Sequence, residues 1–132
     1  YEYIKRVDKK YDAILVDSTD PVGPAKVLFS EEFYSLVLKR LNENGIFATQ
    51  SGSPFVYPEH LKMAYENLKK IFRYVKVYTA FIPTYPSSFW SFTLASMNEI
   101  VRKRERNFET MYYNEDIHDH PYIPNFLKKL IQ

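Results

Sequence analysis

The sequence contains no cysteine among its 132 residues. Disulfide bonds, thiolate zinc sites and cysteine nucleophiles are therefore excluded. No stretch approaches the roughly 20 apolar residues that span a bilayer, and no signal-peptide pattern opens the chain. These absences favour a soluble protein of the cytoplasm that acts without a membrane.

An excess of charge of one sign is also missing. The 18 Lys and Arg residues nearly balance the 16 Asp and Glu residues, for a net charge of +2. The charges are interspersed except for the basic run Arg102, Lys103, Arg104 and Arg106, which we interpret as a solvated face. This balance argues against a dedicated nucleic-acid-binding protein. The length suits one domain or part of one, and the start at Tyr1 close to a strand-like run suggests a fragment.

The apolar pattern predicts alternating strands and helices. Ser30 is the expected N-cap of a helix that Gly45 ends, and Pro58 is expected in the first turn of a second helix. Strands are expected over 12–16, 46–50, 75–79 and 91–95, with a rigid proline-containing loop over 18–25. A polar segment from Met97 precedes a short docking helix over 124–131.

This order is typical of half an open α/β sheet, and its last two strands are expected to pair antiparallel. Ligands bind beyond the carboxyl ends of the strands in such sheets. The loops that begin at Asp17, Gln50 and Ile82 are therefore expected to converge on one site.

Asp17 and Asp20 follow the first predicted strand and are held by a loop that contains two prolines and one glycine. Two fixed carboxylates form an anionic pocket that suits a cation, since an ammonium about 4 Å from a carboxylate gains roughly 4 kcal/mol at an effective dielectric near 20. The alternative is structural: Asp17 caps a neighbouring helix and Asp20 begins a turn.

Three blocks of sequence carry a resemblance to a known family. They are Asp-Ser-Thr-Asp-Pro-Val-Gly-Pro at 17–24, Ile-Pro-Thr-Tyr-Pro-Ser at 82–87, and Tyr-Tyr-Asn at 112–114 with Ile117 and His118. Together they resemble the spermidine synthases, the polyamine aminopropyltransferases. The resemblance implies the carboxyl-terminal half of a Rossmann-like, class I methyltransferase-type sheet with flanking helices and an antiparallel last strand. It places the catalytic domain at 1–97 and a carboxyl-terminal extension at 98–132.

The resemblance also assigns roles within the first block. Asp17 becomes the proton acceptor, and the residues that contact the diamine are Asp17, Ser18, Thr19 and Asp20. Pro24 is expected to lie against the thioadenosine part of the donor.

Three residues outside the first block complete the predicted site. Tyr85 is expected to contact the amine, and Gln50 and Trp90 are expected to line the same pocket. Each has a structural alternative: Tyr85 covers the core, Trp90 packs within a strand, and Gln50 satisfies backbone groups at a strand end.

The implied reaction transfers an aminopropyl group from decarboxylated S-adenosylmethionine to putrescine, with no metal or other cofactor. A free alkylamine has a pKa near 10.4, so the attacking nitrogen needs a carboxylate to accept its proton. Asp116, His118, Asp119 and His120 could suggest a metal site, but their spacing is irregular and favours none.

The sequence departs from the family in what it lacks. Its three glycines leave no glycine-rich turn for the donor, an amino-terminal β-rich segment is absent, and Ser88 stands where the family commonly has glycine. We therefore expect an amine-binding half that is inactive alone and belongs to a homodimer or homotetramer when complete. The alternatives are a different amine acceptor, another transferase on this fold such as a methyltransferase, and a non-catalytic binding or assembly module.

Overall fold

In the computed structural model, the described residues form a four-stranded sheet with helices packed against it. The structure describes residues 1–85, 87–101, 109–119 and 125–131, without the side chains of Asp119 and Phe126. In chain order the elements are α1 (Glu2–Arg6), β1 (Tyr11–Val16), the 3₁₀ helix η1 (Gly23–Phe29), α2 (Glu31–Arg40), β2 (Leu41–Gln50), α3 (Pro58–Ile71), β3 (Tyr74–Phe81), β4 (Phe89–Ser96), α4 (Glu115–Asp119) and α5 (Asn125–Leu130). The expected α/β class is confirmed.

The strands are arranged in the order β1-β2-β4-β3. β1 and β2 are parallel, whereas β4 is antiparallel to both of its neighbours, as expected for the last two strands. Val16 pairs with Thr49, and Gln50 pairs with Phe92. This register brings the carboxyl ends of β1 and β2 to the same edge of the sheet, next to the beginning of β4.

The helix α2 begins where the sequence predicts and ends earlier. The hydroxyl of Ser30 accepts a hydrogen bond of 3.2 Å from the backbone N–H of Phe33, which confirms the N-cap. The helix ends at Arg40 rather than near Gly45, because Leu41 already pairs with Tyr11 of β1. The expected strand at 46–50 therefore starts at Leu41.

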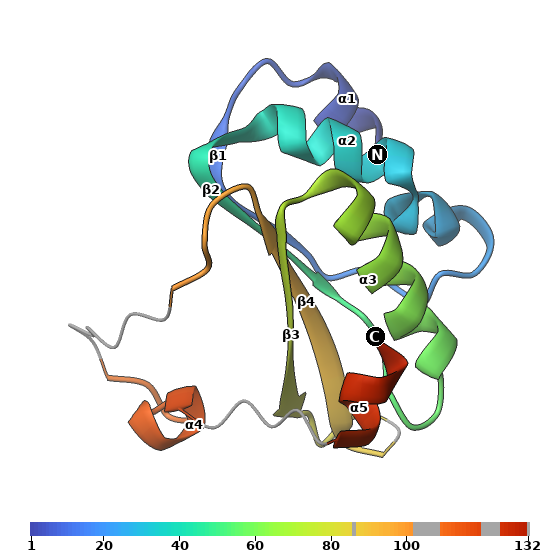
Figure 1. Cartoon of the computed structure of the whole chain (residues 1–132), viewed down its shortest axis with the longest axis vertical. Helices are drawn as coiled ribbons and strands as arrows, with labels where there is room; N and C mark the ends of the chain where they lie inside the picture. The colour runs from blue at the N-terminus through green and yellow to red at the C-terminus, as the bar shows by residue number, and fades with distance from the viewer. Residues whose placement is uncertain (86, 102–108, 120–124, 132) are drawn as a thin grey trace.

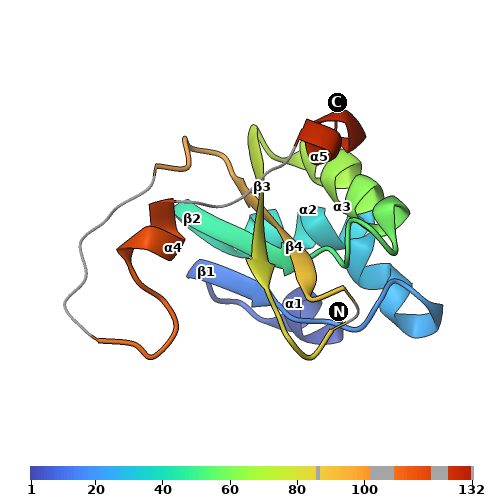
Figure 2. The same ribbon diagram turned by 90° about the horizontal axis from the view of Figure 1, so that it is seen from below.

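Helices cover one face of this sheet. Figure 1 shows α1, α2, α3 and α5 on the same side of the strands, with α4 apart from them. Side chains alternate along a strand, so Phe47 and Ala95 enter the core on the helical side while Ala48 and Leu94 point to the other side and are only half-buried. We call this second side, which the described helices leave uncovered, the open face; the view in Figure 2 turns the same ribbon by a quarter turn.

The carboxyl-terminal helix docks as expected. Leu127 of α5 is fully buried in a small cluster with Leu61 of α3 and Val77 of β3. The sequence did not predict α1 or α4, although Ile4 of α1 is buried in the main core. The basic run at 102–106 lies outside the described residues, and no described helix is long and apolar enough to cross a membrane.

Candidate active site

A cavity of about 400 Å³ lies on the open face, where β1 and β2 end and β4 begins. The three loops that were expected to converge do so, because Asp17, Gln50 and Ile82 all line it. The site was expected beyond the carboxyl ends of the strands. The cavity lies there and also over the open face. Asp17 belongs to this face because it follows Leu15 at a spacing of two residues.

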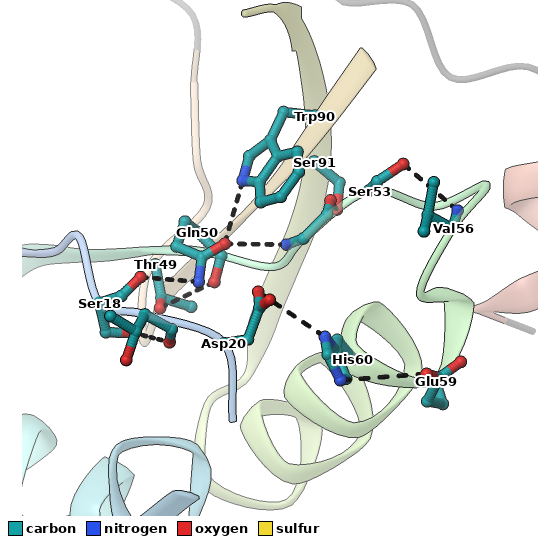
Figure 3. Close-up of polar contacts among 12 residues, drawn as sticks. Ser18, Asp20, Thr49, Gln50, Ser53, Val56, Glu59, His60, Trp90 and Ser91 are labelled. Atoms are coloured by element: carbon teal, nitrogen blue, oxygen red, sulfur yellow. Dashed lines mark hydrogen bonds and ion pairs between the residues drawn. The ribbon is translucent and has the colours of Figure 1, made fainter. Parts of the chain in front are cut away.

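The side chain of Gln50 connects three segments at this site (Figure 3). Its Nε2 donates to the carbonyl oxygen of Ser18 at 2.9 Å, and its Oε1 accepts from the backbone N–H of Gly52 and from Nε1 of Trp90, each at 3.0 Å. Gln50 is 5% exposed. Its amide therefore both lines the cavity and satisfies nearby backbone groups, so both interpretations of Gln50 describe part of what it does.

Two aromatic pairs form walls of the cavity. The rings of Tyr85 and Trp90 lie 4.5 Å apart between centroids, and those of Tyr78 and Phe92 stack at 5.1 Å. Burial raises the pKa of Tyr78, so its hydroxyl stays protonated at neutral pH. Such walls suit a methylene chain that carries cationic ends.

The loop between β3 and β4 is held in a tight conformation. The N–H of Ile82 donates to the carbonyl of Ser88 at 2.7 Å, and the N–H of Ser88 donates to the carbonyl of Tyr85 at 2.9 Å. Ser88 has φ +54° and Ser87 has φ +64°, in the left-handed region that glycine occupies without strain. The hydroxyls of Ser87 and Ser53 share a hydrogen bond of 2.7 Å, which ties this loop to the one after β2.

One family matches the chain over most of its length. The sequence model of the spermine/spermidine synthase domain matches residues 1–105. The chain belongs to the spermine/spermidine synthase family. Among relatives of this family, the polyamine aminopropyltransferase of Thermoplasma volcanium is 48% identical over 131 residues, which is 98% of this chain and 48% of that protein. The polyamine aminopropyltransferase of Bacillus subtilis is 41% identical over 137 residues, which is all of this chain and 50% of that protein.

Solved structures of spermidine synthases have the same fold. A crystal structure of a spermidine synthase with the transition-state analogue AdoDATO superposes with a TM-score of 0.87 at 37% identity, covering 98% of this chain and 47% of that one. The spermidine synthase of Thermotoga maritima gives a TM-score of 0.84 at 36% identity and covers 98% of this chain and 46% of that one. The expected Rossmann-like fold is confirmed, and the chain spans about half the length of these proteins.

Not all the residues that the family resemblance singled out line this cavity. Thr19 and Pro24 are exposed and lie outside its lining, and Ser18 joins it through the contact of its carbonyl with Gln50. Asp20 also lies outside this lining, and its carboxylate is directed toward the ring of His60 on α3, with 3.9 Å between Oδ1 and Nδ1 (Figure 3). Sequence reasoning did not place His60 at the site, because no local pattern links it to a loop so far away in the chain.

The expectations about metal and domain boundaries stay predictions. No group of three or more His, Asp or Glu residues that could hold a metal occurs in the described part of the chain. Nδ1 of His118 is hydrogen-bonded to the hydroxyl of Tyr113, while His120 and the side chain of Asp119 lie outside the described residues. A boundary at residue 97 is likewise untested, and the family match continues to residue 105.

Proposed function

We propose that the full-length protein transfers an aminopropyl group from decarboxylated S-adenosylmethionine to putrescine and produces spermidine and methylthioadenosine. Membership of the family supports this reaction class. The observation that carries the proposal is the shared cavity, which Asp17 lines together with Tyr85 and Trp90. A base and apolar walls in one cavity are what an amine nucleophile with a methylene chain needs.

The chemistry follows from the charge of the amine. Putrescine is protonated at neutral pH, so the attacking nitrogen first gives a proton to the carboxylate of Asp17, a step worth about 10² to 10⁴ in rate. The nitrogen lone pair then forms a bond to the carbon next to the sulfonium. The carbon–sulfur bond breaks, its electrons stay on sulfur, and neutral methylthioadenosine leaves.

The other residues hold the substrates in line. Asp20 binds the distal ammonium, and the rings of Tyr85 and Trp90 enclose the methylene chain, so that orientation adds to the effect of the base. Contacts of Ser18 and Thr19 with the diamine, and of Pro24 with the thioadenosine, remain proposals from the family resemblance. The absence of a further cofactor, the cytoplasmic location and the assembly into a homodimer or homotetramer also remain proposals.

An aminopropyl-transfer assay on the full-length protein tests the proposal. We expect thioadenosine release to depend on a diamine, and Asp17→Asn to lower kcat by about a hundredfold or more, because the amide cannot accept the proton. A panel of diamines of different length identifies the acceptor. Asp12→Asn is the matched control, since Asp12 lies on β1, the strand that Asp17 follows, and is hydrogen-bonded to Asn42 at 2.6 Å, away from the cavity.

Two results would each contradict a different part of the proposal. Full activity of Asp17→Asn would remove Asp17 as the base while keeping the reaction. A native protein that consumes no diamine would remove the reaction itself and favour a non-catalytic module.

A further inference from the structure

The ring of His60 is held rigidly in the first turn of α3. It is 14% exposed and stacks on the ring of Tyr57, with centroids 5.1 Å apart and planes at 15°. On another side it is covered by Gly52, where an added Cβ would lie 3.6 Å from Nδ1. Gly52 has φ +79°, so a side chain there would be strained as well as close to the ring. The ring therefore has little freedom to move.

One nitrogen of this ring has an unmet hydrogen-bonding need. Nδ1 is buried and has no hydrogen-bond partner in the described structure. The carboxylate of Asp20 lies 3.9 Å from it, about 1 Å beyond hydrogen-bonding distance. Leaving a buried polar nitrogen unpaired is unfavourable, so closing this gap is favourable.

The two partners differ in exposure. The side chain of Asp20 is 41% exposed and belongs to a loop, whereas His60 is enclosed on a helix. Closing the gap therefore moves the carboxylate and leaves the ring in place. The position of the ring then sets the position of the negatively charged carboxylate of Asp20.

We infer that His60 is a positioning residue that fixes the carboxylate of Asp20 through Nδ1 and thereby sets the length of diamine that the site accepts. The inference rests on the proposed function, in which Asp20 binds the distal ammonium. The distance from Asp17 to a fixed Asp20 then acts as a ruler for the two nitrogens of the substrate. Glu59 lies 3.9 Å from the other ring nitrogen and is 67% exposed, so it faces solvent rather than the cavity.

Two substitutions of His60 in the full-length protein test this role. His60→Leu replaces the ring with an apolar side chain of similar size and so removes Nδ1. We expect the KM for putrescine to rise about tenfold, as for loss of a hydrogen bond to a charged group. The KM for the donor and kcat should change little, and the preference for putrescine over cadaverine should fall. His60→Asn carries an amide nitrogen near the place of Nδ1 and should restore most of the KM and the preference.

A double-mutant cycle with Asp20→Asn asks whether His60 acts through that carboxylate. In the Asp20→Asn background we expect His60→Leu to change the KM for putrescine by less than about twofold, because the coupled partner is gone. Glu59→Gln is the matched control at the other ring nitrogen and should leave the KM near its native value. An equal effect of His60→Leu in both backgrounds, or a Glu59→Gln variant that behaves like His60→Leu, would overturn the inference.

Calorimetric titration with putrescine separates this inference from the proposed reaction. Binding that is weakened by His60→Leu and rescued by His60→Asn supports the positioning role even if no aminopropyl transfer is detected. Native protein that does not bind putrescine, or a His60→Leu variant that binds it with native affinity, contradicts the positioning role whatever the activity assay gives.

Discussion

The hydroxyl of Tyr34 has no hydrogen-bond partner among the residues that the structure describes, although Tyr34 is completely buried. Its ring lies among those of Phe33 and Phe47, with centroids 6.0 and 5.5 Å away. Burial raises the pKa of this hydroxyl well above its ordinary value. The side chain contributes its ring to the core while its oxygen carries an uncompensated loss of hydration.

We expect Tyr34→Phe to raise the free energy of unfolding by about 1 kcal/mol at neutral pH, because it removes an unsatisfied buried hydroxyl and keeps the ring. The gain should increase above a pH of about 10, where the unfolded native chain ionises Tyr34 and the folded chain does not. Denaturant unfolding of the full-length protein between neutral and alkaline pH measures both effects. Tyr65→Phe, at a half-buried position on α3, is the control and should be nearly neutral. A loss of stability in Tyr34→Phe would show that the hydroxyl has a partner after all.

At the scale of single residues, the sequence predicts a functional role where that role depends on residues nearby in the chain. Asp17 was predicted because an apolar run typical of a strand directly precedes it, although β1 contains no buried residue within the described structure. Tyr85 and Trp90 were predicted from the family resemblance. The contact of His60 with Asp20 joins two distant segments, so no local pattern announces it. The exposure of Thr19 and Pro24 likewise depends on the path of the loop and η1 after β1, which no local pattern predicts.

Among the elements, α2 depends on a single side chain at its start. The hydroxyl of Ser30 accepts from the N–H of Phe33 and donates to the carbonyl of Val27 at 2.7 Å, so it joins η1 to α2. Phe33 begins the buried stripe of this helix, and the cap therefore also fixes how the helix enters the core.

Ser30→Ala should lower the free energy of unfolding by about 1 kcal/mol, since it removes the N-cap. Denaturant midpoints of the full-length protein measure the change. Ser35→Ala lies within the same helix, where alanine is the better helix former, and should be neutral or slightly stabilising. Equal effects of the two substitutions would contradict the capping role.

The order of the strands in the sheet could not be predicted from the sequence. The local pattern predicted each strand and the antiparallel pairing of the last two, but it did not predict that β4 would lie between β2 and β3. That order depends on pairings such as Gln50 with Phe92, which join segments on either side of a whole helix. The early end of α2 has the same origin, because the pairing of Leu41 with Tyr11 overrides a helical pattern that continues to Gly45.

Taken as a whole, the described part of the molecule leaves much apolar surface uncovered. Leu15 on the open face is 75% exposed, and β1 pairs with β2 alone within the described residues. An exposed strand edge beside apolar side chains favours association with another chain.

We therefore predict that the 132-residue chain, expressed by itself, has no aminopropyltransferase activity and self-associates as its concentration rises. Sedimentation velocity over a range of concentrations measures the association, and Leu15→Lys should weaken it by placing a charge on the apolar surface. The full-length protein should show one defined oligomer over the same range. A short chain that is monomeric or active would contradict this prediction.

The place of β4 between β2 and β3 also fixes an order of events during synthesis. When β3 leaves the ribosome, β2 is already available, yet β3 has no neighbour in the described sheet until β4 follows, because β4 lies between the two. The hairpin of β3 and β4 closes through its own short loop on a timescale of about 1–10 μs, far faster than translation adds residues. We expect the finished hairpin to dock on β2 as a unit. Because its loop carries Tyr85, we expect the cavity that Tyr85 and Asp17 line to be completed only in this late docking step.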